Sequence, residues 1–574
     1  FMGGMIGRLF QEFAVSIGVA VLLSGVVALT LTPMLCARWL AHAPIANPLS
    51  RAFDATFVRF RDWYGDTLRA SMRHRGLMLL LSLALLGAMF WLAAHVRQGF
   101  IPRVDSGMLF ASVQYPEGIP FEELSRRQQK IADIVRRNPA VEGLMSSAGQ
   151  GGGGVTGGNV GRLVIRLTPR DTRPGADAVI EELRTATRKV SDATVLLQNP
   201  ASINVGALSS ASDYQITLTS GDFETLKHVS SAVEKRLDAL PEIEDVNSDL
   251  QLRNPELRLV VDPIEAARLG ITPQQVQQTL YDALGGRRIS EIYGTSDQYS
   301  VTVEALPEAQ LDPAIIGRLP IRTAAGTTTR LDAIARVEPG VGPISVNHFG
   351  QQPAVTLSFN LAQGASLNEA LARALATARE DLPADVTAQL AGAAQKFQES
   401  TVTLPLLLLF TVLVIYMVLA VLYEHLGHPL TILSALPLAG FGALLVLLLA
   451  NEELNIFSFV GIILLVGLVK KNGIMMVDFA LTRQRAGMSA EDAIVEASLV
   501  RLRPIMMTTF AAIFATLPVA IGFGAGGEAR RPLGIAVVGG LVFSQFLTLY
   551  VTPTFYVSMA RLEAWLVRQR ARFA

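Results

Sequence analysis

Seven apolar stretches constrain the fold of this chain more than any other feature of its sequence. Each is about 20 residues long, the length of helix needed to cross roughly 30 Å of hydrocarbon. Half of the 574 residues are hydrophobic and only 17% are charged, as expected where lipid is part of the solvent. We predict seven membrane spans, near residues 13–33, 77–96, 402–422, 429–450, 456–480, 504–524 and 533–553.

The connections between spans differ in arginine content, and the positive-inside rule converts this difference into an orientation. The segment 41–75 is rich in arginine, which places it in the cytoplasm. Its apolar and charged residues alternate at helical spacing, which indicates an amphipathic helix in the membrane interface, or a helix simply exposed to water. The tail 561–574 is then cytoplasmic too, and the region from about 98 to 400 faces the outer side.

This outer region has the alternating patterns of a soluble α+β module. Residues 99–204 are predicted to form elements in the order βαββαβ, which is that of a ferredoxin-like unit. A second such unit is expected from 205–254 and 339–397, interrupted by an insertion at 255–338. The predicted fold class is a membrane α-helical bundle of seven spans joined to a large α+β module of ferredoxin-like subdomains.

Several classes of function are disfavoured by composition. The formal net charge is zero, whereas nucleic-acid binding needs a basic surface. Cys36 is the single cysteine, so neither an intrachain disulfide nor a cysteine-based metal site is expected, and no metal site is predicted. The glycine run 148–161 lacks the context of a phosphate-binding loop and indicates a flexible loop. No catalytic constellation is present, so an enzyme is not expected.

The first and last spans resemble each other. Residues 13–33 align without gaps on residues 533–553, matching Ser24 with Ser544 and Pro33 with Pro553. Small and aliphatic residues match easily, so chance similarity is an alternative, but repeated halves are common in transporters. If the repeat is real, residues 1–40 are the last span of a missing N-terminal half, and the spans at 76–98 and 398–560 belong to the second half.

Two adjacent lysines, Lys470 and Lys471, lie in the middle of the fifth apolar stretch. A charge at this depth costs a few kcal/mol, so it persists where it has a partner or a function. Lysine at depth also releases its proton readily, which suits proton coupling. The alternative is that both ammonium groups extend to the interface. Asp478 lies two turns beyond Lys471, too far for an ion pair, so the expected counter-ion is absent from the neighbouring sequence.

The segment GIILLVGLVKKNGIMMVDFA, with RLRPIMMTTFAAIFATLPVAIGFG after it, resembles the C-terminal half of the resistance-nodulation-cell division (RND) exporters, in their hydrophobe/amphiphile efflux branch. The opening span resembles the sixth span of that family, and the similarity covers essentially the whole chain. It implies that Lys471, beside Asn472, is the relay lysine of the membrane part. It also implies that Arg501 and Thr508 are relay-associated residues; seven apart, they share one helix face. The counter-ion is expected to be a pair of aspartates in the missing half.

The resemblance implies proton-driven export of amphiphilic or hydrophobic compounds, with no cofactor besides the proton gradient. The expected location is the bacterial inner membrane, with the α+β module in the periplasm as the porter. The expected partners are the missing half, further subunits in a homo- or heterotrimer, a periplasmic adaptor and an outer-membrane channel. Protons are expected to enter from outside, protonate the aspartates and break their interaction with the lysine.

The glycine run matches the switch loop of the family, which implies substrate contacts at Gly149, Gly152 and Val155, and at Leu197 in the following strand. Related drug pumps have phenylalanines in this loop and in the strand after it. In this chain the loop has no phenylalanine, and Leu197 occupies the position in the strand. The double lysine and glycine-rich loop are more similar to subunits that form heteromers of two paralogues. Two alternatives remain: a subunit that supports a heteromer without coupling protons, and a heavy-metal exporter. The latter would need methionines in the outer module, which has only Met108 and Met145.

Overall fold

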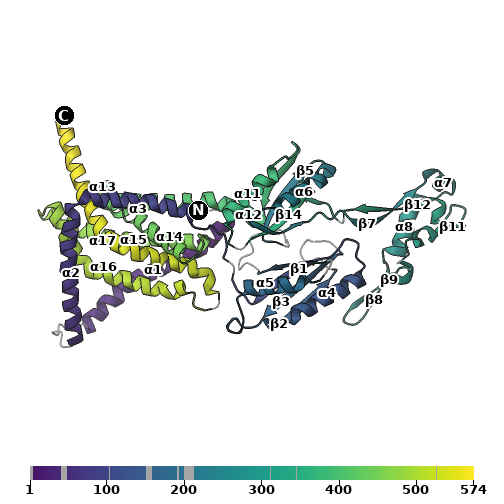
Figure 1. Cartoon of the computed structure of the whole chain (residues 1–574), viewed down its shortest axis with the longest axis horizontal. Helices are drawn as coiled ribbons and strands as arrows, with labels where there is room; N and C mark the ends of the chain where they lie inside the picture. The colour runs from purple at the N-terminus through teal and green to yellow at the C-terminus, as the bar shows by residue number, and fades with distance from the viewer. Residues whose placement is uncertain are drawn as a thin grey trace.

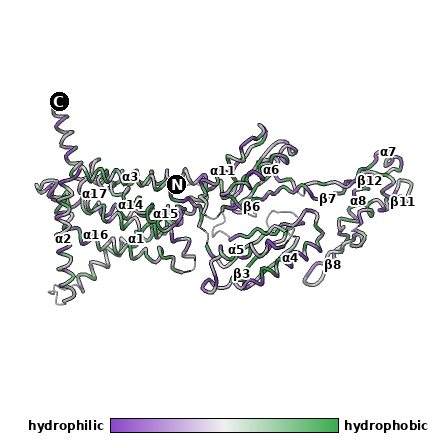
Figure 2. The backbone as a smooth tube through the Cα atoms, viewed as in Figure 1, coloured by the Kyte–Doolittle hydropathy of each residue, from purple (hydrophilic) through white to green (hydrophobic). Residues whose placement is uncertain are grey.

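The computed structural model describes the chain except for residues 1–3, 40–47, 103, 150–157, 191–192, 200–211, 311, 344, 363, 525 and 574. The molecule is elongated, with a bundle of long helices at one end and a β-rich soluble part extending from it (Figure 1). Hydrophobic residues are concentrated along the bundle (Figure 2). The two ends of the molecule therefore suit different solvents.

Seven helical segments of the described residues are long and apolar enough to cross a membrane. Each predicted stretch coincides with one of them, and three stretches run one to three residues past the end of the helical segment. The fourth is divided into two helices at Ser434–Ala435, directly before Pro437, which has no backbone N–H to continue the first helix. The helices are α1 (Gly4–Trp39), α3 (Arg75–His95), α12 (Gly392–Tyr423), α13 (Gly427–Leu433) with α14 (Leu436–Leu449), α15 (Ile456–Arg485), α16 (Ala490–Ile521) and α17 (Gly527–Phe573).

Helix α17 is longer than a membrane span requires. Helix α17 continues without a break from the bundle to Phe573 and projects beyond it (Figure 1). The tail contains no Gly or Pro after Pro553, so nothing in it ends the helix. The segment 561–573 therefore continues the helix of the last span.

Helix α2 (Pro48–Arg73) lies across the ends of the spans rather than alongside them (Figure 1). One face packs on the bundle: Tyr64 and Leu68 are buried, and the Tyr64 hydroxyl donates to the Leu549 carbonyl at 2.7 Å. Phe53 and Trp63 are exposed on the outer side. The helix thus has the amphipathic character that the sequence predicts.

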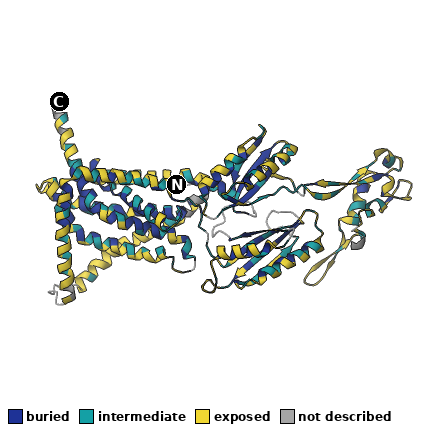
Figure 3. Cartoon of the chain, in the orientation of Figure 1, coloured by how far each residue is buried: buried dark blue, intermediate teal, exposed yellow. Residues whose placement is uncertain are grey.

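Helix α17 lies at the centre of the bundle and contacts α14, α15 and α16. Glycines allow the close approach to α15. A side-chain carbon at Gly461 would lie 2.9 Å from the Leu533 carbonyl oxygen, and one at Gly540 would lie 2.2 Å from a methyl group of Leu465. Burial is accordingly greatest in α14, α15 and α17, whereas α1 is exposed along most of its length (Figure 3).

The first soluble subdomain, subdomain 1, has its elements in the predicted βαββαβ order. Its antiparallel strands lie in the order β2-β3-β1-β4, and its core is formed by one face of the sheet and the two helices. The elements are β1 (Met108–Gln114), α4 (Phe121–Arg136), β2 (Val141–Ala148), β3 (Val160–Leu167), the 3-10 turn η1 (Arg170–Thr172), α5 (Ala176–Thr187) and β4 (Thr194–Gln198).

Subdomain 2 is built from two separated stretches and repeats this strand order as β6-β14-β5-β15. The short strand β13 (Asn347–Phe349) pairs with the first three residues of β14. The elements of the subdomain are β5 (Tyr214–Ser220), α6 (Phe223–Asp238), β6 (Ile243–Ser248), β14 (Gln352–Leu361), α11 (Leu367–Arg379) and β15 (Val386–Ala391).

The insertion begins and ends with a paired ribbon, β7 (Asn254–Val261) and β12 (Ala335–Gly342), within four residues of the predicted limits. It has a small core of its own that includes Ile271 and Leu331. The rest of the insertion is α7 (Pro263–Arg268), α8 (Pro273–Leu284), β8 (Arg287–Tyr293), β9 (Gln298–Val303), α9 (Pro307–Gln310), α10 (Ile315–Arg318), β10 (Pro320–Arg322), β11 (Thr328–Arg330) and η2 (Leu331–Ala333).

Each subdomain is attached to a different span. Phe100 and Ile456, the latter at the first residue of α15, belong to the hydrophobic core of subdomain 2. The backbone on both sides is joined by a parallel bridge between Gln98 and Leu454. Subdomain 1 is instead tied to α17, where Glu528 accepts a hydrogen bond from the Asp105 backbone at 3.4 Å and pairs with Arg170.

Candidate functional site

Helix α15 carries the two lysines and has well-defined ends. The Asn455 side chain accepts hydrogen bonds from the backbone N–H groups of Phe457 and Ser458, which caps the first turn. Arg483 and Arg485 lie in the last turn, where cations interact favourably with the helix dipole. Between these ends the helix has no Pro, and its lysines are fixed in the middle of the span.

Lys471 lies on an exposed stripe of α15 together with Gly467 and Asp478. Positions four and seven residues apart share a helix face, so the stripe runs along one side of the span. Lys470 is half-buried on the neighbouring side. Within the described part of the chain, neither lysine has an ion pair or a side-chain hydrogen bond. Lys471 therefore presents a cation on a surface of the bundle that no described segment of this chain covers.

Asn472 has the opposite environment and is only 5% exposed. Its side-chain amide donates to the Thr509 hydroxyl at 3.3 Å and to the Gln545 Oε1 atom at 3.2 Å. The Thr509 hydroxyl donates to the same Gln545 oxygen at 2.6 Å. We call these three side chains the amide network. It connects α15, α16 and α17 in the interior of the bundle.

Arg501 lies on α16, about two helix turns before Thr509. Its guanidinium carbon is 5.1 Å from the centre of the Phe479 ring, and Arg483 lies 5.2 Å from the same ring. Arg483 is paired with Glu496 at 2.8 Å, whereas the buried Nε of Arg501 has no hydrogen-bond acceptor among the described residues. Arg501 is thus held by a cation–π contact, and the described residues leave its Nε–H group without an acceptor.

Thr508 does not join the network. Its hydroxyl donates to the Ile505 carbonyl of its own helix at 3.2 Å. No hydrogen bond joins Lys471, Arg501 and Thr508 to one another among the described residues. Sequence reasoning missed Thr509 and Gln545. A signal for Gln545 existed, because α17 carries no charged residue from 532 to 560 and an amide in so apolar a segment needs a partner.

Of the four predicted substrate contacts, the structure describes Gly149 and Leu197. Gly149 has φ = +75°, and a side chain there would lie 3.1 Å from the Phe121 ring, so both conformation and space favour glycine. Gly152 and Val155 lie outside the described residues. Leu197 is 3% exposed and packs in the core of subdomain 1, paired with Ala111 of β1. Its side chain therefore supports the sheet from inside and does not reach an open surface.

The opposite face of the sheet is more accessible. Met108, Arg162 and Met145 are exposed, and the half-buried Phe110 ring lies 5.4 Å from the Arg162 guanidinium carbon. The two methionines are on β1 and β2, with β3 between them. Two strand spacings put their backbones roughly 10 Å apart. The outer module has no third methionine to complete a soft-metal site.

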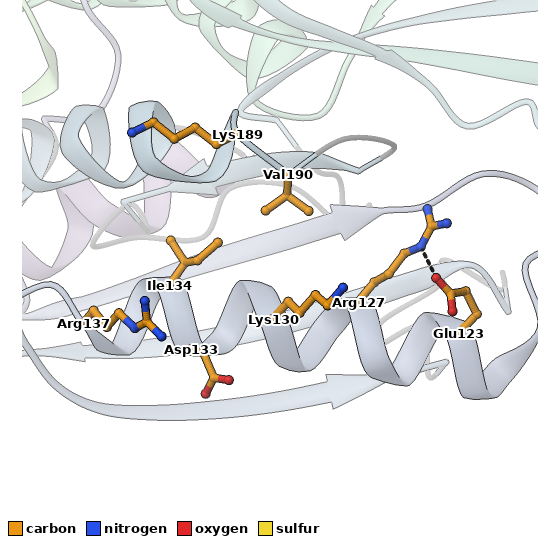
Figure 4. Close-up of a pocket in the computed structure, with 8 residues that line it drawn as sticks. All are labelled: Glu123, Arg127, Lys130, Asp133, Ile134, Arg137, Lys189 and Val190. Atoms are coloured by element: carbon orange, nitrogen blue, oxygen red, sulfur yellow. Dashed lines mark hydrogen bonds and ion pairs between the residues drawn. The ribbon is translucent and has the colours of Figure 1, made fainter.

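A groove of about 500 Å³ lies on the helical side of subdomain 1, between α4 and the end of α5. Figure 4 shows the charged side chains that line it, including Lys130, Asp133 and Lys189, with Arg127 paired to Glu123. Only Ile134 and Val190 are apolar. Sites for hydrophobic compounds are mostly apolar, so this groove does not suit an amphiphilic substrate.

The junction of subdomain 1 with the bundle contains a buried ion pair. Arg173 donates to both carboxylate oxygens of Asp105, at 2.5 and 2.7 Å, and the side chains are 2% and 6% exposed. The backbone N–H groups of Gly107 and Ala176 donate to the same carboxylate. The bonds from Arg173, followed by these N–H groups, hold the pKa of Asp105 below its usual value in spite of burial.

The model of the AcrB/AcrD/AcrF family matches residues 1–560, nearly the whole chain. The chain belongs to this family. Its members are efflux transporters of the RND type. The long apolar helices and β-rich soluble part described above are those of an RND transporter fold.

This AcrB/AcrD/AcrF family member is also similar to crystal structures of a heavy metal efflux pump in two crystal forms. With one, the TM-score is 0.79 and the identity 25%, over 88% of this chain and 53% of that chain. With the other, the values are 0.77 and 26%, over 88% and 52%. The chain spans about half the length of the solved structures it matches.

Proposed function

We propose that this chain is the C-terminal half of a proton-driven exporter of amphiphilic or hydrophobic compounds, in the hydrophobe/amphiphile branch of the RND family. Lys471, Asn472, Arg501 and Thr508 are its relay residues. The observation that carries the proposal is the exposed cation of Lys471 in the middle of an apolar span. Because a bare charge facing lipid is costly, the surface around Lys471 is expected to be covered by a segment that carries carboxylates.

The proposal also includes the membrane, the orientation of the chain in it and the partner proteins. The seven helices span the bacterial inner membrane, α2 lies at the cytoplasmic interface, and the two ferredoxin-like subdomains face the periplasm. The pump is a trimer that joins a periplasmic adaptor and an outer-membrane channel. A porter role is supported by the accessible face of the subdomain 1 sheet, where the Phe110 ring and the Arg162 guanidinium offer an aromatic surface and a cation. Gly149, Gly152 and Val155 are proposed as the substrate-contacting residues of the glycine run.

The test is export of a bile salt and a cationic dye by the complete pump that contains this chain, compared with its Lys471→Ala variant. Removing the only exposed ammonium group on the described α15 stripe is expected to lower gradient-dependent export by at least about tenfold at normal expression, since general acid–base partners contribute roughly that much or more. Lys470→Ala is the matched control. Normal export by Lys471→Ala would support the scaffold subunit instead.

A heavy-metal exporter is the second candidate, and the similarity to a heavy metal efflux pump favours it. The donor groups argue against it: the described residues contain no group of three or more His, Cys, Asp or Glu that could hold a metal ion, and Met108 and Met145 are separated by a strand. Survival of cells in copper or silver salts, compared with survival in bile salts, distinguishes the two. Protection against the metals alone would overturn the amphiphile proposal.

A further inference from the structure

We propose that Gln545 is a positioning residue of the pump, which fixes the rotation of α15 and thereby the direction of Lys471. The inference rests on the proposed proton-driven function. Its basis is the amide network of Asn472, Thr509 and Gln545, which joins three spans at the depth of the lysine.

The Gln545 carbonyl oxygen is the common acceptor of the network. It receives one bond from α15 and one from α16, and its amide nitrogen lies 3.2 Å from the sulfur of Met506. The three side chains are 5 to 6% exposed, so water does not compete for these bonds. A buried donor left without its acceptor costs more than the bond contributes, so the network favours one arrangement of the three helices.

This arrangement determines where the lysine points. Lys471 and Asn472 are adjacent and lie about 100° apart around the helix axis. When Asn472 is bonded to Gln545 inside the bundle, Lys471 is directed to the exposed stripe. The glycine contacts of α15 with α17 bring the two helices close enough for the short amide side chains to meet. Rotation of α15 would therefore break the network and at the same time move the ammonium group of Lys471.

The charged groups near the site lie on α15 and α16, and not on α17, which carries Gln545. Lys470 and Lys471 are on α15 and Arg501 is on α16, whereas α17 has no charged residue between 532 and 560. Gln545 is neutral and does not itself exchange protons. Its contribution is therefore geometric, and loss of it acts on proton coupling only through the position of Lys471.

The experiment compares Gln545→Leu and Ser544→Ala in the complete pump. Leucine has a similar size to glutamine but accepts no hydrogen bond. Ser544 is buried beside Gln545 and bonds only to Thr548 among the described residues, which makes it a matched control. Export per folded pump is measured over a range of external pH. We expect Gln545→Leu to lower maximal export by roughly tenfold, which corresponds to about 1.4 kcal/mol, and Ser544→Ala to leave it unchanged.

The pH dependence separates positioning from support of the fold. A misplaced ammonium group stabilises the partner carboxylates less, which raises their pKa. The external pH of half-maximal export is therefore expected to rise in Gln545→Leu. If Gln545 only supports the fold, Gln545→Leu lowers the amount of folded pump but leaves both the export per folded pump and this midpoint unchanged, and that result would overturn the inference.

A second pair of variants decides the question if Gln545→Leu does not fold. Thr509→Val removes the hydroxyl donor, and Thr509→Ser keeps it. We expect Thr509→Val to shift the external pH of half-maximal export and Thr509→Ser to keep the value of the unmodified pump. Equal behaviour of the two would contradict the inference. Normal export by Lys471→Ala would contradict the proposed function, whereas its loss beside normal export by Gln545→Leu would contradict this inference alone.

Discussion

In the soluble part, Arg173 donates to both oxygens of Asp105 and the pair is almost fully buried, whereas Lys471 lies on an exposed stripe without an anion among the described residues. Both cations belong to regions where an unpaired charge is unfavourable. Asp105 also receives backbone N–H bonds, so the hydrogen-bonding of that pair is complete within the chain.

The two cations therefore have different roles, one in the stability of the fold and one in transport. The Asp105–Arg173 pair attaches subdomain 1 to the segment that leaves the bundle, so its effect is on stability. Lys471 has no ion pair or side-chain hydrogen bond among the described residues, so its effect is expected on transport. Substitutions at the two sites should therefore change different quantities.

The largest expected change in stability follows from Arg173→Ala. Removal of one partner leaves the buried Asp105 carboxylate unpaired, which costs about 3–5 kcal/mol. Hydrogen exchange of the β1 and β4 amides in the purified pump measures this as faster local opening. Arg170→Ala is the control, because its pair with Glu528 is half exposed and should contribute less than about 1 kcal/mol. Equal effects of the two variants would remove the contrast between buried and exposed pairs.

A smaller effect, which depends on pH, is expected from Asp105→Asn. The folded state lowers the pKa of Asp105, so its contribution is complete above the unfolded pKa of about 4 and is lost as pH falls through the lower folded value. We expect a destabilisation of roughly 2–3 kcal/mol that is constant from about pH 8 to pH 5. It should shrink below about pH 4. Hydrogen exchange at several pH values checks this, and a difference that grows in acid would show the wrong sign.

The smallest effect on stability is expected from Lys471→Ala. The soluble subdomains should keep their exchange protection within about 0.5 kcal/mol, as for exposed positions in general. The same variant is expected to lose export. If it destabilised the soluble part as Arg173→Ala does, the ammonium group would have a structural partner in this chain and the comparison would fail.

Periodicity and hydropathy predicted the positions of the spans and the order of the soluble elements, because each of these depends on residues that are neighbours in sequence. The sites depend on distant residues. Asp105 and Arg173 are 68 positions apart, and neither belongs to a recognisable motif. Thr508 and Thr509 are adjacent and chemically identical, so only the packing of α16 decides which one faces Gln545.

The attachments of the two subdomains have a mechanical consequence. Subdomain 2 shares its core with the first residue of α15, and subdomain 1 is tied to Glu528 in the first turn of α17. These helices are in contact along the bundle. A small axial translation of α15 along α17 would therefore displace subdomain 2 relative to subdomain 1 by a similar distance.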